Sequence, residues 1–242
     1  MRRWKRSGAF SWRYRLFEGR GMCRFLMIKS QLPYQAADVL SKFAAMAEES
    51  RAPDGDRQAD GWGIGWLDQE GHWQVRKSLR SIWQETDSLD EFPASRLFLV
   101  HARSASFPHQ KDVLEYNQPY IEESYGFVFN GLLEGVTLPF PVGGRIGAQK
   151  IWSLLSAGLG RSGPKESLIE LAGDLGRYSR RVQALNIGLA GQGRLYAYCR
   201  YEGDGGYYQL QYLDFPDLQM VCSEALAGFN FQPVPRGRVL RL

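Results

Sequence analysis

Cys23 is the residue whose type and position most suggest a chemical role, because it directly follows an internal methionine, Met22. If Met22 is the true start, or if the chain is cut before Cys23, this one residue carries a thiol and a free α-amine. An α-amine titrates near about pH 8, so it can take the thiol proton without a separate histidine. On position alone, Cys23 is more readily interpreted as a small buried hydrophobic residue at the start of a strand.

Two later segments carry groups with catalytic or binding potential. Arg103 follows the apolar segment 96–101, and an arginine at a strand end suits planar, bidentate binding of a carboxylate. Asn130-Gly131 follows the apolar segment 125–129, and an Asn amide with the next Gly N–H can form an oxyanion hole. Taken singly, Arg103 is more typical of a surface salt bridge, and Asn-Gly is first of all a hairpin-turn signal.

The first half of the chain predicts strands and one helix around these residues. Segment 24–28 predicts a short buried strand that Pro33 breaks, and apolar residues at helical spacing over 35–49 predict an amphipathic helix. Glycines alternate with large apolar residues over 60–67, which predicts a strand with one nearly bare face. Segment 73–77 returns as the second arm of a hairpin.

The second half predicts two helices followed by further strands. The helices span 148–159 and 165–178, with a Gly- and Pro-containing link over 160–164. Strands joined by Gly turns are predicted over 184–190, 194–201, 207–213 and 219–222. The order of strands, helices and strands is compatible with an α+β fold but does not establish it.

The composition is that of an ordinary globular chain, with 44% hydrophobic and 23% charged residues. A length of 242 residues suits one sizeable domain, and no apolar run reaches the roughly 20 residues needed to cross a bilayer. We expect no membrane association and, from the sparse, unpaired cysteines, a reducing, cytoplasmic location. Three scattered histidines predict no metal site.

Residues 1–21 form a basic leader ahead of a domain that spans 22–242. Residues 1–22 contain seven basic residues and one acidic residue, which leaves 23 basic and 25 acidic residues in the remainder. The leader is a nucleic-acid-binding arm, a removed propeptide, or upstream sequence joined by a wrong start assignment, and we favour the last. The net charge of −2 in the body argues against nucleic acid as a partner.

Five segments then stand in one order along the chain. They are Met22-Cys23-Arg24-Phe25, Asp60-Gly61-Trp62-Gly63, His101-Ala102-Arg103-Ser104-Ala105-Ser106, Phe129-Asn130-Gly131 and Cys222-Ser223-Glu224-Ala225-Leu226. Together they resemble the class II glutamine amidotransferase domain of the N-terminal nucleophile (Ntn) hydrolases. The single-domain branch that includes the γ-glutamyl amidohydrolase of ergothioneine synthesis is the most similar. The resemblance covers about residues 22–240 and implies a four-layer αββα sandwich.

The resemblance implies roles for the matching residues. Cys23 would attack the side-chain amide of glutamine or of a γ-glutamyl metabolite, and form a thioester with its own α-amine as base. Asn130 Nδ2 and the Gly131 N–H would hold the oxyanion. Arg103 would bind the substrate α-carboxylate. The implied substrate-binding residues are Arg103, Ser104, Asp60 and Gly61.

The resemblance also bears on partners. It implies no metal and no cofactor. Because the chain has no synthase domain, any transfer of ammonia would need a separate synthase subunit.

The chain departs from the family pattern at two places. Phe129 stands where the family usually has a histidine, which is tolerable because that histidine is not the base of the nucleophile. Gly147 stands where the family usually has the Asp that binds the substrate α-ammonium, and Gln149 replaces the nearby acid. Either the substrate lacks a free α-ammonium, or another acid such as Asp60 or Glu134 substitutes, or the protein has drifted from catalysis.

Two alternatives to the amidohydrolase therefore remain. A catalytically weak Ntn-fold protein could bind a ligand or a partner, as the glycine at position 147 suggests. An unrelated β-rich protein could bind nucleic acid through the basic leader, against which the net charge of the body counts.

Overall fold

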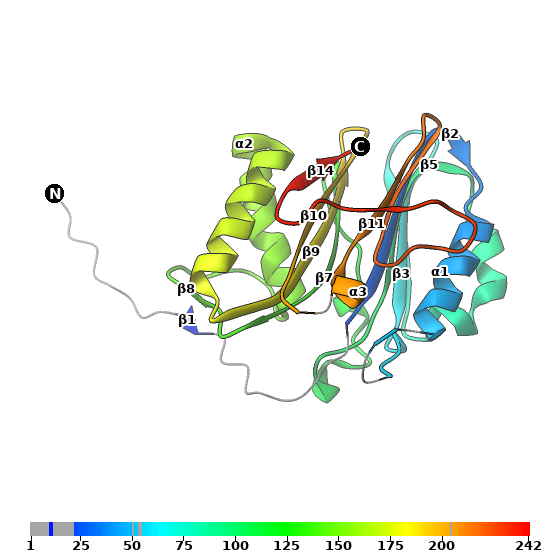
Figure 1. The fold of residues 1–242 in the computed structure, drawn as a ribbon. Coiled ribbons are helices and arrows are strands. Elements are labelled where there is room, and N and C mark those ends of the chain that lie inside the picture. The colour runs from blue at the N-terminus through cyan, green and yellow to red at the C-terminus, as the bar shows by residue number, and fades with distance from the viewer. Residues whose placement is uncertain (1–9, 12–21, 50, 53–54, 204) are drawn as a thin grey trace.

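The computed structural model describes residues 10–11, 22–49, 51–52, 55–203 and 205–242. Two antiparallel β-sheets face each other, and a major helix covers the outer face of each sheet (Figure 1). The predicted α+β class is confirmed. Of the predicted leader, only Phe10–Ser11 (β1) lies within the described residues, and it pairs with Thr137–Leu138 (β8).

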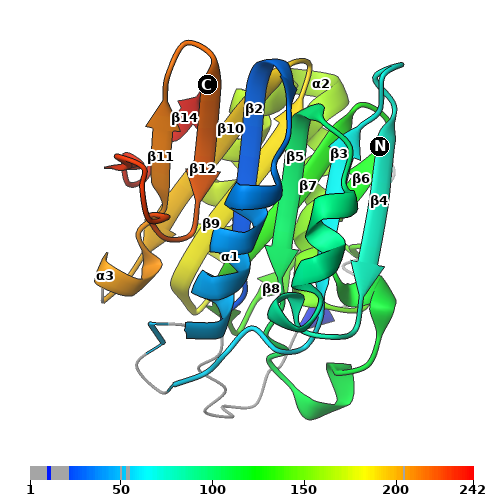
Figure 2. The ribbon, with the colours of Figure 1, turned by 90° about the vertical axis from the view of Figure 1, so that its right-hand side faces the viewer.

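The first sheet has seven strands. The strand that follows Cys23 is the first of them along the chain and lies in the middle of the sheet. Its strand order is β13-β11-β12-β2-β5-β3-β4. The strands are β13 (Gln232–Pro233), β11 (Gln211–Asp214), β12 (Leu218–Cys222), β2 (Arg24–Tyr34), β5 (Ser95–Ala102), β3 (Trp62–Leu67) and β4 (Trp73–Ser78). Figure 2 shows helix α1 (Ala37–Glu49) in front of this sheet.

The second sheet has five strands, in the order β14-β10-β9-β7-β6. They are β14 (Val239–Arg241), β10 (Arg194–Tyr201), β9 (Arg181–Gly191), β7 (Tyr125–Glu134) and β6 (Tyr120–Glu122). Helix α2 (Gly147–Tyr178) covers its outer face, and a short helix, α3 (Gly205–Tyr208), follows β10.

Alternation along the central strands explains why both faces of the seven-stranded sheet are buried. In β2, Phe25 and Met27 point toward the five-stranded sheet and pack in the core with Val128 of β7. Leu26 and Ile28 point the other way and pack with the apolar face of α1. Such a period of two places one set of side chains in each core.

The two helices follow their predicted patterns. Helix α1 buries Val39, Leu40, Phe43, Ala44 and Ala47, which recur at helical spacing. Helix α2 is interrupted at Gly163, whose φ of 78° and ψ of 170° are non-helical, so the two predicted helices are confirmed as its halves.

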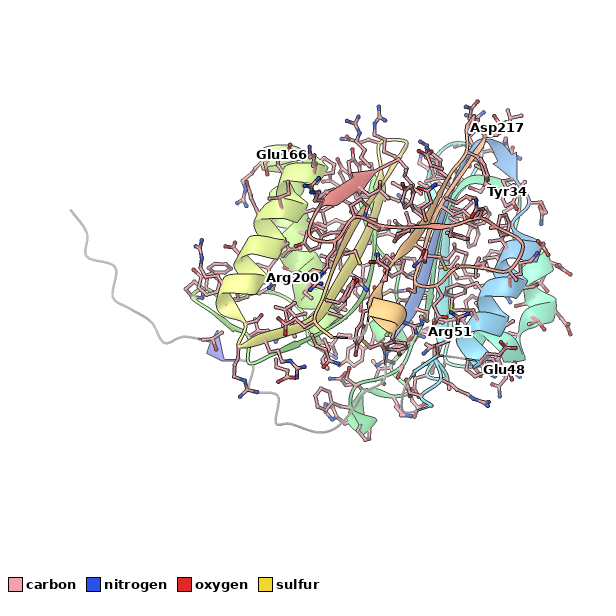
Figure 3. The ribbon with its side chains drawn as sticks, viewed as in Figure 1. Tyr34, Glu48, Arg51, Glu166, Arg200 and Asp217 are labelled. Atoms are coloured by element: carbon pink, nitrogen blue, oxygen red, sulfur yellow. The ribbon has the colours of Figure 1, made fainter. Side chains whose placement is uncertain are left out.

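The outer surfaces of these helices carry polar side chains. Glu48 on α1 and Glu166 on α2 are exposed (Figure 3). Among the described residues, no helix is both long enough and apolar enough to cross a membrane.

Two strand boundaries were predicted wrongly. Pro33 does not end the first strand, which continues to Tyr34 past a register shift, where a missing ladder N–H is tolerated. The strand predicted over 207–213 begins only at Gln211 because residues 205–208 are helical.

Asn130-Gly131 is not a hairpin turn. Strand β7 runs through both residues, which pair with Asn186 and Leu185 of β9. The ten-residue pairing of β7 with β9 outweighs the local turn preference of Asn-Gly, because each step adds backbone hydrogen bonds and side-chain packing.

Candidate active site

Cys23 lies just before β2 and opens into a cavity of about 150 Å³. Its thiol donates a hydrogen bond to the Ser104 carbonyl oxygen at 3.4 Å. Burial raises the pKa of the Cys23 thiol, although a hydrogen bond from the Ser104 backbone and the positive charge of Arg103 oppose this rise. The thiol is therefore protonated at neutral pH and needs a base before it can attack.

The residue before the cysteine is buried. Met22 packs with Ala184 and Tyr207, and its carbonyl oxygen accepts a hydrogen bond from Gln58 Nε2 at 3.0 Å. With Met22 attached, the nitrogen of Cys23 is a peptide amide that cannot act as a base. A base at this atom exists only in a chain that begins with Cys23.

Arg103, directly after β5, is a buried cation in the wall of the cavity. Its Nη2 donates to the Gln110 carbonyl oxygen at 2.6 Å, and its guanidinium lies 5.6 Å from the centre of the Tyr116 ring. Its Nη1 is buried with no hydrogen-bond partner among the described residues. A buried guanidinium N–H without a partner is costly, so the site favours an anion that accepts from it.

Asp60 and Gly61 support the segment that carries Arg103. The Arg103 N–H donates to the Gly61 carbonyl oxygen at 2.8 Å, and the Asp60 N–H donates to the Arg103 carbonyl oxygen at 2.9 Å. The Asp60 carboxylate accepts from the Ala105 N–H and pairs with Lys111 Nζ, both at 2.8 Å. Neither Asp60 nor Gly61 lines the cavity, whereas Ser104 does.

Position 61 requires a glycine for two reasons, the backbone conformation and the close packing around it. Its φ is 109°, and a Cβ there would lie 2.3 Å from Asn117 Nδ2 and 2.6 Å from the Ser78 carbonyl oxygen. The bare strand face predicted for 60–67 is therefore occupied by another segment. In particular, a Cβ on Gly63 would lie 2.1 Å from the Gln118 carbonyl oxygen.

The predicted oxyanion-hole residues lie on β7, in the other sheet. Gly131 lines the cavity, whereas Asn130 is buried and does not line it. Asn130 Nδ2 donates to Ser223 Oγ at 3.3 Å, and the same oxygen accepts from the Phe25 N–H at 2.9 Å. Through Ser223, Asn130 is thus connected to the beginning of β2, two residues from Cys23.

A buried ion pair fixes the residue after Cys23. Arg24 is fully buried, and its Nη2 lies 2.7 Å from Glu224 Oε1. Its guanidinium also lies 4.2 Å from the centre of the Tyr207 ring. Glu224 belongs to the fifth segment of the resemblance, so that segment anchors the start of β2.

Two polar residues near the nucleophile were missed as site residues. Gln118 lines the cavity, and its amide bonds both backbone groups of Phe129, at 2.6 Å and 3.2 Å. His101 also lines the cavity, and burial, together with the charge of Arg103, lowers its pKa to about 3. His101 is therefore neutral at physiological pH. No local sequence pattern indicates that Gln118 faces a cavity.

The start of α2 forms another part of the wall. Ile146, Gly147 and Ala148 line the cavity. Gln149 Oε1 accepts from the N–H groups of Arg145, at 2.8 Å, and Ile146, at 3.4 Å, so this side chain caps the helix. The first turn of α2, which the structure describes in full, contains no acidic residue.

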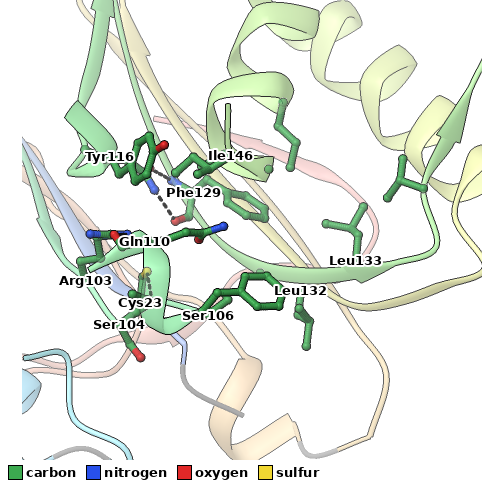
Figure 4. Close-up of a pocket in the computed structure, with 18 of the residues that line it drawn as sticks. Cys23, Arg103, Ser104, Ser106, Gln110, Tyr116, Phe129, Leu132, Leu133 and Ile146 are labelled. Atoms are coloured by element: carbon green, nitrogen blue, oxygen red, sulfur yellow. Dashed lines mark hydrogen bonds between the residues drawn. The ribbon is translucent and has the colours of Figure 1, made fainter. Parts of the chain in front are cut away.

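Figure 4 shows how these groups surround the cavity. Cys23, Arg103 and Ser104 lie on one side, and Leu132 and Leu133 lie on the other. The arrangement places a thiol, a buried cation with a free N–H, and the Gly131 backbone around one space. Such a site can hold a carboxylate while a nucleophile reaches another part of the same molecule.

Comparison with solved structures gives the same fold. A glutamine aminotransferase class-II domain protein from Silicibacter pomeroyi is 15% identical, with a TM-score of 0.59 over 90% of this chain and 94% of that one. A predicted glutamine amidotransferase from Pseudomonas aeruginosa is 16% identical, with a TM-score of 0.56 over 90% and 96%.

A longer protein shares the fold over part of its length. The glutamine phosphoribosylpyrophosphate amidotransferase from B. subtilis is 14% identical, with a TM-score of 0.60 over 90% of this chain and 47% of that one. No protein-family model and no curated protein sequence matches the chain. The structural matches confirm, at the level of fold, the resemblance that the five segments indicated. The chain therefore has the fold of class II glutamine amidotransferase domains.

Proposed function

We propose that this protein is an amidohydrolase of the class II glutamine amidotransferase type, which cleaves the side-chain amide of glutamine or of a γ-glutamyl metabolite. The observation that carries the proposal is the cavity wall shared by Cys23, the unpartnered Nη1 of Arg103, and Gly131. The order of helix, sheet, sheet and helix supports a four-layer αββα Ntn-hydrolase sandwich as the architecture (Figure 1).

The chemistry requires a chain that begins at Cys23, so we propose that residues 1–22 are absent from the active protein. The free α-amine then takes the proton from the thiol. Such a base is needed because the raised pKa of the thiol keeps it protonated at neutral pH. Arg103 holds the substrate carboxylate through its free Nη1. The thiolate attacks the amide carbon, and the Gly131 N–H and Asn130 Nδ2 stabilise the oxyanion, for which Asn130 exchanges its bond to Ser223.

The other proposed properties follow from this reaction. The substrate is a small molecule, and transfer of the ammonia to an acceptor would need a separate synthase subunit. The proposal includes a cytoplasmic location and neither nucleic acid nor membrane as a partner.

The competing function is ligand or partner binding by a catalytically weak Ntn fold. Two observations favour it: the glycine at position 147, and the bond that already occupies Asn130 Nδ2. This alternative predicts that ligands bind while Cys23 stays unreactive.

Labelling of the nucleophile distinguishes the two functions. The full chain is expressed, and the mass of the purified protein is measured before and after treatment with a glutamine-analogue chloroketone. The amidohydrolase predicts a mass that begins at Cys23 and gains one adduct, which is lost in Cys23→Ala. A protein that keeps residues 1–22 in its native host and takes no label at Cys23 supports the binding function instead.

A further inference from the structure

The charges around the cavity suit an anion, and the described side chains that line it offer no unpaired carboxylate to a substrate ammonium. Glu134 is the one acidic side chain among the described residues that line the cavity. It accepts hydrogen bonds from Arg180 Nη2 and Arg181 Nη1, each at 3.3 Å, so two cations already neutralise it. Asp60, the other acid considered as a substitute, is paired with Lys111 and lies outside the lining.

The cavity wall at Gly147 also lacks a group that could bind an ammonium. Gly147 is the first residue of α2 and has no side chain with which to bind a cation. The N–H groups of a helix's first turn carry partial positive charge, so they repel an ammonium group. Gln149, the next polar side chain, is occupied by the backbone of Arg145 and Ile146.

An apolar surface extends from this point. The cavity is lined by Leu132 and Leu133 at the end of β7, by Val136 beyond it, by Ile146 just before α2 and by Ile151 within α2. Figure 4 shows Leu132 and Leu133 on the far side of the cavity from Arg103. Burying a ligand's apolar group against such a surface is favourable, whereas burying an unpaired ammonium is strongly unfavourable.

We propose that the substrate is a glutamine or γ-glutamyl amide whose α-nitrogen carries an apolar acyl group. This inference rests on the proposed function and specifies the substrate of the same site. Acylation removes the charge of the α-ammonium, which explains why a carboxylate is absent from the wall at Gly147. The acyl chain lies against Leu132, Leu133 and Ile151, while the α-carboxylate bonds Arg103 Nη1.

The reaction balances without a co-reactant other than water. The bond from Cys23 Sγ to the side-chain carbonyl carbon forms as the carbon–nitrogen bond breaks. The thiol proton passes through the α-amine of Cys23 to the departing ammonia or amine. Water then adds to the thioester carbon as the carbon–sulfur bond breaks, and one of its protons returns to the sulfur. The products are ammonia or an amine and an N-acylglutamate.

Product binding tests the ligand class without depending on catalysis. Calorimetry compares N-hexanoyl-L-glutamate with L-glutamate and N-acetyl-L-glutamate on the protein isolated after expression of the full chain. We expect the hexanoyl compound to bind at least about tenfold more tightly than the acetyl compound, because each buried methylene adds affinity. We expect L-glutamate to bind most weakly. Binding of L-glutamate as tight as that of the hexanoyl compound, or no binding of the hexanoyl compound, overturns the inference.

Substitution at Gly147 provides a matched pair of variants. Gly147→Asp restores a carboxylate at a helix start, where an acid is well tolerated. It is expected to raise affinity for L-glutamate about tenfold and to lower affinity for the hexanoyl compound. Gly147→Asn has nearly the same size without the charge and is expected to produce no gain for L-glutamate. A gain in both variants, or in neither, contradicts the role given to the missing carboxylate.

An assay of ammonia release distinguishes failure of the acyl-substrate inference from failure of the proposed function. The protein is incubated with L-glutamine and with N-hexanoyl-L-glutamine. Faster turnover of L-glutamine, with Cys23 labelled, overturns the acyl substrate and leaves the amidohydrolase standing. Tight binding of the hexanoyl compound with no ammonia from either amide, and no label at Cys23, supports the ligand class and overturns the proposed function.

Discussion

Arg103 differs from an ordinary surface arginine because the protein has already removed it from water. It is only 3% exposed, and its one side-chain hydrogen bond in the described structure, from Nη2, goes to a carbonyl oxygen that carries no full charge. The cost of removing the guanidinium from water is therefore met during folding and not when a carboxylate binds. A ligand that accepts from Nη1 gains a charge-assisted bond in a water-poor cavity, where such bonds are strong.

Replacement of Arg103 tests this role. Arg103→Lys keeps the charge but loses the planar fork, and is expected to raise KM at least about tenfold while kcat changes less. Arg96→Lys is the matched control, because Arg96 lies on β5, the strand that leads to Arg103, and is exposed. Steady-state ammonia release measures both variants. An unchanged KM in Arg103→Lys would show that the substrate carboxylate binds elsewhere.

Replacement of Asn130 is expected to lower the reaction rate more than replacement of the residues around it. Loss of one oxyanion donor costs about 10²–10³ in rate, so Asn130→Ala is expected to lower kcat by that factor with little change in KM. Ser223→Ala removes the partner of Asn130 Nδ2 but keeps the donor, and should cost less than about tenfold. Thermal denaturation of both variants separates loss of rate from loss of fold. Equal losses of kcat in the two would assign Asn130 to positioning alone.

At the scale of elements, the site depends on where β7 and α2 meet. Strand β7 brings Gly131 and Leu132 to the cavity, and α2 begins there with Gly147. The second half of α2 lies beyond the break at Gly163 and packs Leu168, Leu171 and Leu175 in the outer core. The break at Gly163 therefore lets α2 change direction, so that its beginning lines the cavity and its second half packs on the sheet.

The break should be sensitive to a side chain. Gly163 has φ 78° and ψ 170°, which an L-residue adopts only with strain, so Gly163→Ala is expected to reduce the free energy of unfolding by about 1–3 kcal/mol. Gly173→Ala is the matched control within the regular part of α2, where a Cβ meets nothing within 4 Å. It should instead increase stability by about 0.5–1 kcal/mol. Urea denaturation measures both, and stabilisation by Gly163→Ala would contradict the assigned conformation.

At the scale of the molecule, the cavity lies where the two sheets meet, with a neutral histidine in its wall. The pKa of His101 is lowered to about 3, below the ordinary value of 6.5. Because the unfolded chain binds this proton first, stability falls as the pH drops from about 6.5 toward 3. The slope from this one residue is about 1.4 kcal/mol per pH unit once the unfolded state is protonated.

Urea denaturation at pH 6.5 and pH 5 checks this effect. His101→Gln should lose about 2 kcal/mol less stability over that interval than the parent chain, since it has no group to titrate there. His109→Gln is the control, because His109 is exposed. If His101→Gln and the parent chain show the same pH dependence, the histidine does not remain neutral in the folded state.

Local patterns predicted most of the helices and strands but not the cavity. The helix over 37–49 follows from apolar spacing alone. Cys23 and Arg103 became candidate site residues only when the five segments were taken together, because each alone has a more ordinary interpretation. Asn130-Gly131 was ambiguous because its turn preference is local, whereas its pairing with β9 involves residues more than fifty positions away. Gln118 and Leu132 have no chemical signature and become part of a site only through packing.

The bond between Phe25 and Ser223 also sets an order of events during synthesis. The two residues are separated by 198 positions, and Arg24 likewise depends on Glu224. A chain emerging from the ribosome therefore makes Cys23 and β2 long before it makes Ser223 and Glu224, which hold the start of that strand. The surroundings of the proposed nucleophile are incomplete until residues 223 and 224 have left the ribosome, so the thiol has no finished site while the intervening chain is being made.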